Sequence, residues 1–150
     1  MTDPGNGLHV DPADMRAMVN ALEKIADRAQ AALDDGATDA ARTIASGAAS
    51  RAAAIGGATA LVAGAIRSSG PDVSIAGGGR ASRYATVGDL MFAAEYGART
   101  PQTRKRWPGH PWRGSGDGAG YFLWPTVAKS DDRIMDDWTA EFDQLIRQVW

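Results

Sequence analysis

Apolar side chains recur at spacings of three and four residues across the first third of the chain, which is the period of an amphipathic helix. The stripe comprises Met15, Met18, Val19, Leu22, Ile25, Ala26, Ala29, Ala32 and Leu33. Asp11 and Pro12 precede it and fit the N-cap and the first helical position. The same period resumes after Gly36. The sequence therefore predicts either one long helix or two helices in series that divide at Gly36.

Residues 29–65 are rich in alanine. Alanine favours helix but buries little area, and a stripe of small residues lets a neighbouring helix approach closely. The composition bias of a GC-rich genome explains the alanines equally well, so close packing stays one of two interpretations.

A second amphipathic pattern runs from Pro125 to the end of the chain. Its apolar positions are Val127, Ile134, Trp138, Phe142, Leu145 and Val149. Acidic residues lie mostly between them, so one face is apolar and the rest is acidic. Pro125 fits the first turn, where its missing N–H is not needed. We expect this helix to dock on the domain rather than to fray.

Glycine and proline interrupt the pattern between these two helices. Gly56 and Gly57 are expected to end the first helix. Residues 58–66 fit a further short helical segment, and the break at 68–71 follows. Residues 72–76 alternate polar and apolar side chains, which predicts a short strand.

The remaining segments are ambiguous. Residues 84–87 fit a strand, and residues 90–96 fit a strand or a helical turn. The glycine- and proline-rich stretch 97–120 reads as a long loop, which in a compact domain is usually functional or disordered. Residues 121–124 fit a short strand or an aromatic anchor in front of the last helix.

Together these elements predict an α+β fold, in which a long N-terminal helix and a C-terminal helix pack on a small antiparallel sheet. We expect residues 1–10 to form a flexible lead-in and residues 11–150 to form a single domain with a loop at 98–120. A chain of 150 residues is long enough for one ordinary core.

Composition removes several classes of function. The chain has no cysteine, and its two histidines, His9 and His110, are far apart, which argues against disulfides and metal sites. Adjacent aspartates such as Asp131 and Asp132 point in different directions on a helix. The longest uncharged run, residues 52–66, is too short to span a bilayer. Phosphate-binding loops and nucleophile elbows are absent, so we expect neither an enzyme nor a cofactor.

Charge is unevenly distributed, although the net charge is only −2. Residues 99–113 combine five basic residues and two tryptophans without any acid. They are Arg99, Arg104, Lys105, Arg106, Trp107, Trp112 and Arg113. Arg and Trp are enriched at protein–protein hot spots, and basic segments with aromatics also bind single-stranded nucleic acid. We favour a protein interface, and a loop that covers its own core is a third interpretation.

Two short motifs carry a family resemblance. Residues 92–97 are similar to an A-x-x-x-E-x-G-T stretch, and residues 121–126 are similar to a P-F-L-R-P-A stretch that an amphipathic helix follows. The alanine-rich first helix fits the same pattern, and residues 57–68 are similar to a T-G-x-L-x-x-S-I stretch. In this order the motifs resemble the neck and tail-completion proteins of long-tailed bacteriophages, over residues 12–150.

The chain departs from that family pattern at several positions. Ala98 and Arg99 follow the glycine where the family has threonine, Trp124 replaces the arginine before the proline, and Tyr121 replaces the first proline. The basic loop is also longer than the family spacing. These departures bear on the roles of single residues rather than on the fold.

The resemblance implies a non-enzymatic virion protein, made in the host bacterial cytoplasm. Such proteins form a homo-oligomeric ring, of six copies in our expectation, at the head–tail junction. The partners implied are the head–tail connector or stopper and the tail terminator or tube proteins, with transient contact to phage DNA in the lumen and no membrane. The expected interface adds Tyr121, Phe122, Trp124 and Trp138 to the residues of the basic loop. The acidic last helix is a possible receiver of that loop.

Two alternatives remain open from the sequence. A small nucleic-acid-binding module would use residues 99–113 and bind with steep salt dependence. A secreted helical-hairpin protein would account for the alanine- and aspartate-rich first helix and would be almost wholly helical.

Overall fold

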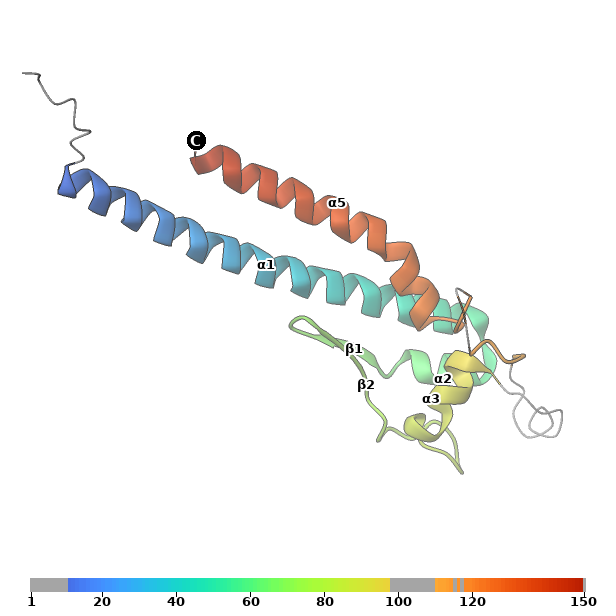
Figure 1. Cartoon of the computed structure of the whole chain (residues 1–150). Coiled ribbons are helices and arrows are strands. Elements are labelled where there is room, and N and C mark those ends of the chain that lie inside the picture. Colours follow the sequence, from blue (N-terminus) through green and yellow to red (C-terminus); the bar gives the residue numbers. More distant parts are fainter. Residues whose placement is uncertain (1–10, 98–109, 115, 117, 150) are drawn as a thin grey trace, which may run out of the picture.

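A long central helix organises the molecule, with a second helix on one side of it and a small lobe on the other (Figure 1). The computed structural model describes residues 11–97, 110–114, 116 and 118–149. The elements are α1 (Pro12–Ile55), α2 (Gly57–Ala63), β1 (Ile66–Ser69), β2 (Asp72–Ile75), α3 (Val87–Tyr96) and α5 (Leu123–Val149). The α+β class with a small antiparallel sheet is confirmed. The expected lead-in, residues 1–10, lies outside the described residues.

α1 is one continuous helix of 44 residues, so the interpretation of two helices divided at Gly36 is wrong. Its start is as predicted: Asp11 is the N-cap, its side chain accepts a hydrogen bond of 2.8 Å from the Ala13 amide, and Pro12 follows. The helix ends at the predicted glycine pair, with Gly56 as its C-cap.

Small residues on α1 let α5 approach closely. A Cβ atom on Gly36 would lie 2.8 Å from Nε1 of Trp138, and one on Gly47 would lie 2.9 Å from Cγ2 of Thr126. Further along α1, Ala41, Ala45, Ala48 and Ala52 are buried. The interpretation that small side chains permit close helix packing is therefore confirmed for this pair of helices.

A β-hairpin follows α2 and packs against α1. β2 covers residues for which a strand was predicted, whereas β1 was missed, because residues 58–66 were expected to be helical. α2 ends at Ala63, and the chain enters the hairpin at Ile66, which is buried and pairs with Ile75. A two-residue turn at positions 70–71 joins the strands, since Ser69 pairs with Asp72.

α3 begins earlier than the sequence suggested, so the predicted strand at residues 84–87 is wrong and 87–96 is helical. The cause is a capping box. Thr86 accepts from the Asp89 amide, and the Asp89 carboxylate accepts from both the amide and the hydroxyl of Thr86, each at 2.8 Å. These hydrogen bonds lower the pKa of Asp89. Within the predicted strand, Thr86 forms an isolated antiparallel bridge with Arg80.

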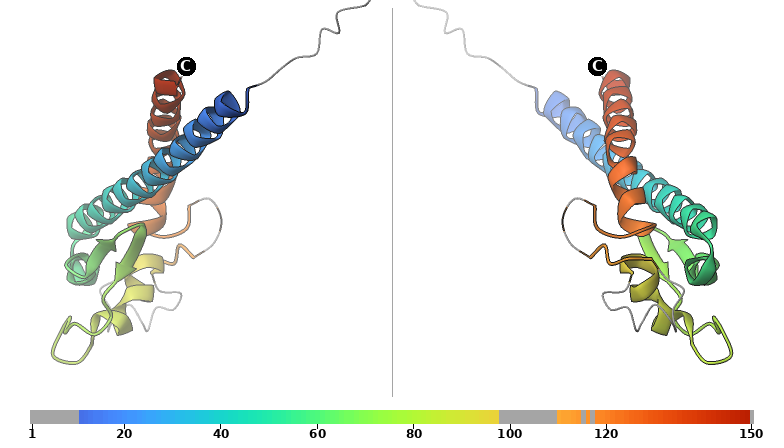
Figure 2. Two further views of the ribbon diagram at one scale, coloured as in Figure 1. Left: turned by 90° about the vertical axis from the view of Figure 1, so that its left-hand side faces the viewer. Right: turned by 90° about the vertical axis from the view of Figure 1, so that its right-hand side faces the viewer.

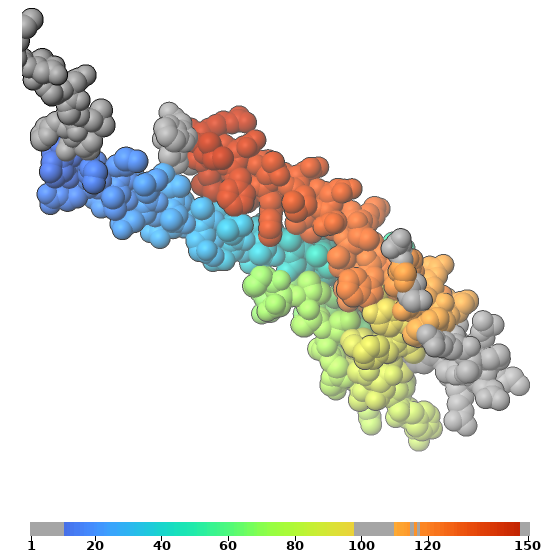
Figure 3. All heavy atoms as spheres, in the orientation of Figure 1, coloured from blue at the N-terminus to red at the C-terminus, as the bar shows by residue number. Residues whose placement is uncertain are grey.

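The core lies where the lobe, the C-terminal part of α1 and the start of α5 meet. Phe122 and Val62 are its largest fully buried side chains. We call the described residues between 57 and 122 the lobe, and α1 with α5 the arm. The two arm helices diverge toward the N-terminus of α1 and the C-terminus of α5 (Figure 2), which gives the molecule an elongated shape (Figure 3).

Candidate functional site

The predicted interface divides between described and undescribed parts of the chain. Five of its residues lie outside the described residues, namely Arg99, Arg104, Lys105, Arg106 and Trp107. The other six have defined positions. Three of these, Trp112, Arg113 and Trp124, gather at one place on the surface, where residues 92–97 meet residues 110–124.

A buried glutamate joins these two segments. Glu95 on α3 is only 5% exposed. Its Oε2 accepts from the amides of Phe122 (3.1 Å) and Leu123 (2.9 Å), and its Oε1 accepts from the amide of Trp124 (3.0 Å). The first amides of a helix have no partner within that helix and carry partial positive charge, so a carboxylate stabilises them strongly. Glu95 thus fixes where α5 begins.

Two glycines make room for this contact. Gly97 has φ of +75° and ψ of −165°, a conformation that essentially only glycine adopts, and a Cβ there would overlap the carbonyl oxygen of Pro111. Gly120 has φ of +77°, and its Cβ would overlap Oε1 of Glu95. Both glycines flank the long loop, one at each end.

Hydrogen bonds then tie the two ends of the loop together. The Arg113 amide donates to the Tyr96 carbonyl at 2.7 Å, and the Gly120 amide donates to the Arg113 carbonyl at 2.6 Å. The Tyr121 hydroxyl donates to the Pro111 carbonyl at 2.6 Å. The base of the loop is therefore fixed to α3 and α5.

Four aromatic side chains form a surface around this base, and we call them the aromatic patch: Phe92, Tyr96, Trp112 and Trp124. The ring of Tyr96 lies 6.2 Å from the rings of both Phe92 and Trp112, and the Trp124 indole N–H donates to the Tyr96 hydroxyl at 2.6 Å. Phe92 is 69% exposed, Trp124 52% and Trp112 40%. Large aromatics held rigidly at a surface are typical anchors of protein interfaces.

The structure corrects the predicted interface at Tyr121 and Phe122. Both side chains are buried in the chain's own core, because the turn into α5 directs them inward, so their assignment to an interface is wrong. The Arg113 guanidinium lies 4.6 Å above the Tyr121 ring. The ring of His110 is half-buried and lies 4.8 Å from the same ring.

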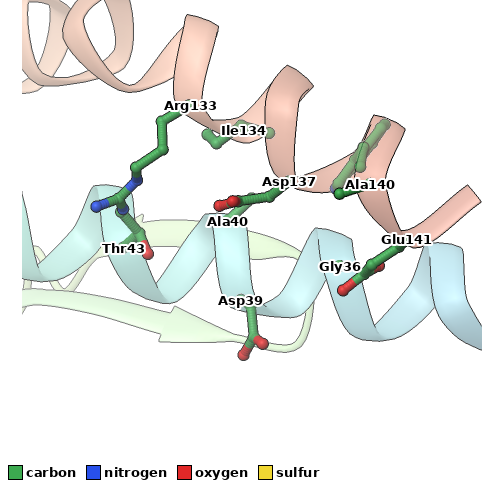
Figure 4. A pocket seen from close by; sticks show the side chains of 10 residues that line it. Gly36, Asp39, Ala40, Thr43, Arg133, Ile134, Asp137, Ala140 and Glu141 are labelled. Carbon is green, nitrogen blue, oxygen red and sulfur yellow. The ribbon is translucent and has the colours of Figure 1, made fainter. Parts of the chain in front are cut away.

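Trp138 lies away from the patch, between α1 and α5. It borders a cleft of about 310 Å³ that also contains Asp39, Arg133, Asp137 and Glu141 (Figure 4). Its indole N–H is buried and has no hydrogen-bond partner among the described residues. The same described part of the chain holds no group of three potential metal ligands.

Sequence reasoning missed Glu95, Phe92 and Tyr96 as site residues. Phe92 and Tyr96 are four positions apart, which places them on one face once residues 87–96 are helical. The ambiguity between strand and helix in this segment hid that relation. The buried role of Glu95 depends on a partner 27 residues away in the sequence.

Comparison with known proteins identifies no relative: no family model, no curated protein and no solved structure matches the chain. Among the described residues, no helix is both long and apolar enough to cross a membrane.

Proposed function

We propose that this chain is a structural virion protein that forms a ring at the head–tail junction of a long-tailed phage and lets DNA pass. It joins the connector to the tail terminator or tube after synthesis in the bacterial cytoplasm. The observation that carries this proposal is the meeting of the two motif stretches. Residues 92–97 and 121–126, far apart in sequence, are joined by Glu95 and its three amide contacts. Both motif stretches thus take part in one contact, and this common structural role supports the resemblance.

The aromatic patch supplies the proposed contact surface. It combines three exposed aromatics with the adjacent Arg113. In the sequence, a basic segment lies between Gly97 and Pro111, two residues that belong to this base. Rigid aromatic anchors beside a basic residue suit a neighbour whose surface is apolar and carries acidic groups.

Removal of the gene from the phage genome that encodes this chain tests the function. The expected result is DNA-filled heads and separate tails in electron micrographs, with infectivity restored when the chain is supplied in trans. Normal joined particles without the chain would contradict the proposal. Antibody labelling of intact particles should mark the head–tail junction.

The triple substitution of Arg104, Lys105 and Arg106 by glutamate tests the role of the basic segment. We expect it to abolish joining while the circular dichroism spectrum of the purified chain stays unchanged. Joined particles with the triple variant would remove the basic segment from the interface.

A nucleic-acid-binding function is the second candidate, because the exposed Trp112 and Trp124 could stack on bases and Arg113 follows Trp112 directly in the chain. Fluorescence anisotropy with a labelled single-stranded oligonucleotide at low salt measures it. Absence of binding there would remove this candidate. The other alternative, a secreted helical-hairpin protein, calls for an almost wholly helical chain, whereas this fold contains the β1–β2 hairpin.

A further inference from the structure

A polar groove lies between α1 and α5, beside the cleft of Figure 4 and closer to the start of α5. It has a volume of about 710 Å³ and carries three basic side chains, Arg51 on α1 and Lys129 and Arg133 on α5. Hydroxyl groups form most of the remaining lining, namely those of Thr43, Ser46, Ser50, Thr126 and Ser130. The described residues that line the groove include no acidic and no aromatic side chain. The groove therefore presents positive charge and hydroxyl groups to a ligand.

Acidic side chains are kept out of this groove by their positions on the two helices. Residues 40–55 of α1 and residues 123–130 of α5 contain none. Asp131 and Asp132 lie about 100° and 200° around the helix from Ser130, so they leave the lining face. The nearest acidic group on that face is Asp137, which borders the neighbouring cleft instead (Figure 4). The ion pairs of the described residues involve none of the three basic side chains of the groove, so no ion pair there neutralises them.

Two of the three basic groups have defined directions. Nε of Arg51 donates to the Tyr121 carbonyl at 2.8 Å. A guanidinium group has five N–H donors, and within the described part of the chain only this one is used. Arg133 extends from α5 toward Thr43 on α1 (Figure 4). Donors that are positioned before binding lower the entropy cost of holding a ligand.

This set of groups matches the phosphates of a nucleic acid backbone. Arg, Lys, Ser and Thr are the side chains that commonly contact DNA phosphates. The three basic groups are exposed and are distributed over two helices, and α1 rises about 12 Å between Thr43 and Arg51. An open, extended groove of this kind suits a row of phosphates better than a single phosphate ion. Bases stack on aromatic side chains, which the lining lacks, so contact is confined to the backbone.

We infer that this groove binds the phosphate backbone of DNA without reading its sequence. The inference rests on the proposed function in one respect, that DNA is the polyanion that this chain meets. It assigns the DNA contact to α1 and α5 rather than to the basic segment at residues 99–113. The net charge of −2 opposes tight binding, which suits DNA that has to move past the protein.

The test measures fluorescence anisotropy of two labelled DNA duplexes of unrelated sequence with the full chain as salt rises. The groove variant carries Lys129→Gln and Arg133→Gln, since glutamine keeps a good helix propensity. The matched control carries Lys24→Gln and Arg28→Gln. It removes the same charge at the same four-residue spacing, from exposed positions of α1 outside the groove. Circular dichroism checks that each variant folds.

We expect the wild type to bind both duplexes equally at low salt. The groove variant should bind at least about tenfold more weakly at about 50 mM salt. The slope of the logarithm of the association constant against the logarithm of the salt concentration should fall in magnitude by about 1.8, because each phosphate contact contributes about 0.9. The control should keep the slope of the wild type.

Four results would overturn the inference. The wild type binds neither duplex at low salt, or the groove variant and its control weaken binding equally. Inorganic phosphate displaces the duplex at constant ionic strength, which would indicate a site for single anions. Trp124→Ala abolishes binding while the groove variant retains it, which would assign the contact to the aromatic patch. Failure of the proposed function is recognised separately: normal joined particles without the gene contradict the phage role, even where the groove binds DNA.

Discussion

At the scale of single residues, the fold depends on a carboxylate placed at the start of a helix. Glu95 is buried, and its two oxygens accept from three consecutive amides at the beginning of α5. Burial removes water from these groups, so each depends on the other for its hydrogen bonds. The hydrogen bond to the Trp124 amide also fixes the backbone position from which the Trp124 side chain reaches the surface.

Glu95→Gln should lower the free energy of unfolding by about 2–3 kcal/mol, because an amide has one acceptor oxygen and its NH₂ group would face a backbone donor. Urea denaturation measures the change. Glu141→Gln, at an exposed position on α5, is the matched control and should change stability little. Equal effects at the two positions would contradict the role of Glu95.

Gly97→Ala should be at least as harmful. The conformation of Gly97 costs another residue about 1–3 kcal/mol, and the added methyl group would overlap the Pro111 carbonyl. The same change at Gly78, where a Cβ meets nothing within 4 Å, is the control. Thermal unfolding followed by circular dichroism compares the two variants, and a Gly97→Ala chain as stable as its control would show that the segment 110–113 adjusts freely.

At the scale of elements, α1 and α5 are held together by shape as well as by apolar area. The glycines of α1 interrupt a good helix sequence at a cost of about 1 kcal/mol each relative to alanine. Gly36 lies against Trp138 and Gly47 against Thr126. A Cβ atom at either glycine would come too close to the α5 side chain, so α5 would have to move away. The helix propensity of α1 is thus lower than it would be with alanine at these positions. The close packing of α5 against the glycines offsets that loss of stability.

Gly36→Ala should destabilise the chain by about 1 kcal/mol, because overpacking costs about 1–3 kcal/mol and exceeds the gain in helix propensity. In a Trp138→Leu background the clash is relieved, so the same substitution should become stabilising by up to about 1 kcal/mol. Chemical denaturation of the four chains of this double-mutant cycle gives both values. The same sign in both backgrounds would show that Trp138 is not the limiting contact.

The capping box of α3 predicts a dependence on pH. Hydrogen bonds from Thr86 lower the pKa of Asp89 below its ordinary value of 3.8. The ionised carboxylate therefore contributes stability that is present above pH 3.8 and is lost as the pH falls through the lower pKa of the folded state. Asp89→Asn should be less stable than the wild type at pH 7, with the difference shrinking in acid. Unfolding curves from pH 7 to pH 2 measure it, and a constant difference would contradict this assignment.

At the scale of the whole molecule, surfaces of unlike character lie at the two ends. The lobe carries the aromatic patch, and the arm carries exposed apolar side chains at its end together with a surplus of acidic residues. An elongated chain with unlike surfaces at its two ends suits the head-to-tail contacts of the ring in the proposed function.

Much of the secondary structure could be predicted from local patterns. The start of α1 at Asp11 and Pro12, its end at the glycine pair, β2 and the amphipathic α5 all follow from spacing, capping and turn residues. The errors fall where local signals compete. β1 is a four-residue strand that exists only by pairing with β2, and α3 is decided by the capping box between Thr86 and Asp89.

The sequence by itself therefore determined that the chain has two amphipathic helices, a short sheet and a basic, aromatic segment, because those features depend on residues close together in the chain. Only the tertiary structure decided that Glu95 holds the start of α5, that Tyr121 and Phe122 belong to the core, and that Phe92 and Tyr96 join Trp112 and Trp124 at the surface. The exposure of apolar side chains at the far ends of α1 and α5 was equally hidden, since an apolar stripe reads the same whether its partner helix covers it or diverges from it. Burial depends on which distant segments meet, and no local pattern contains that information.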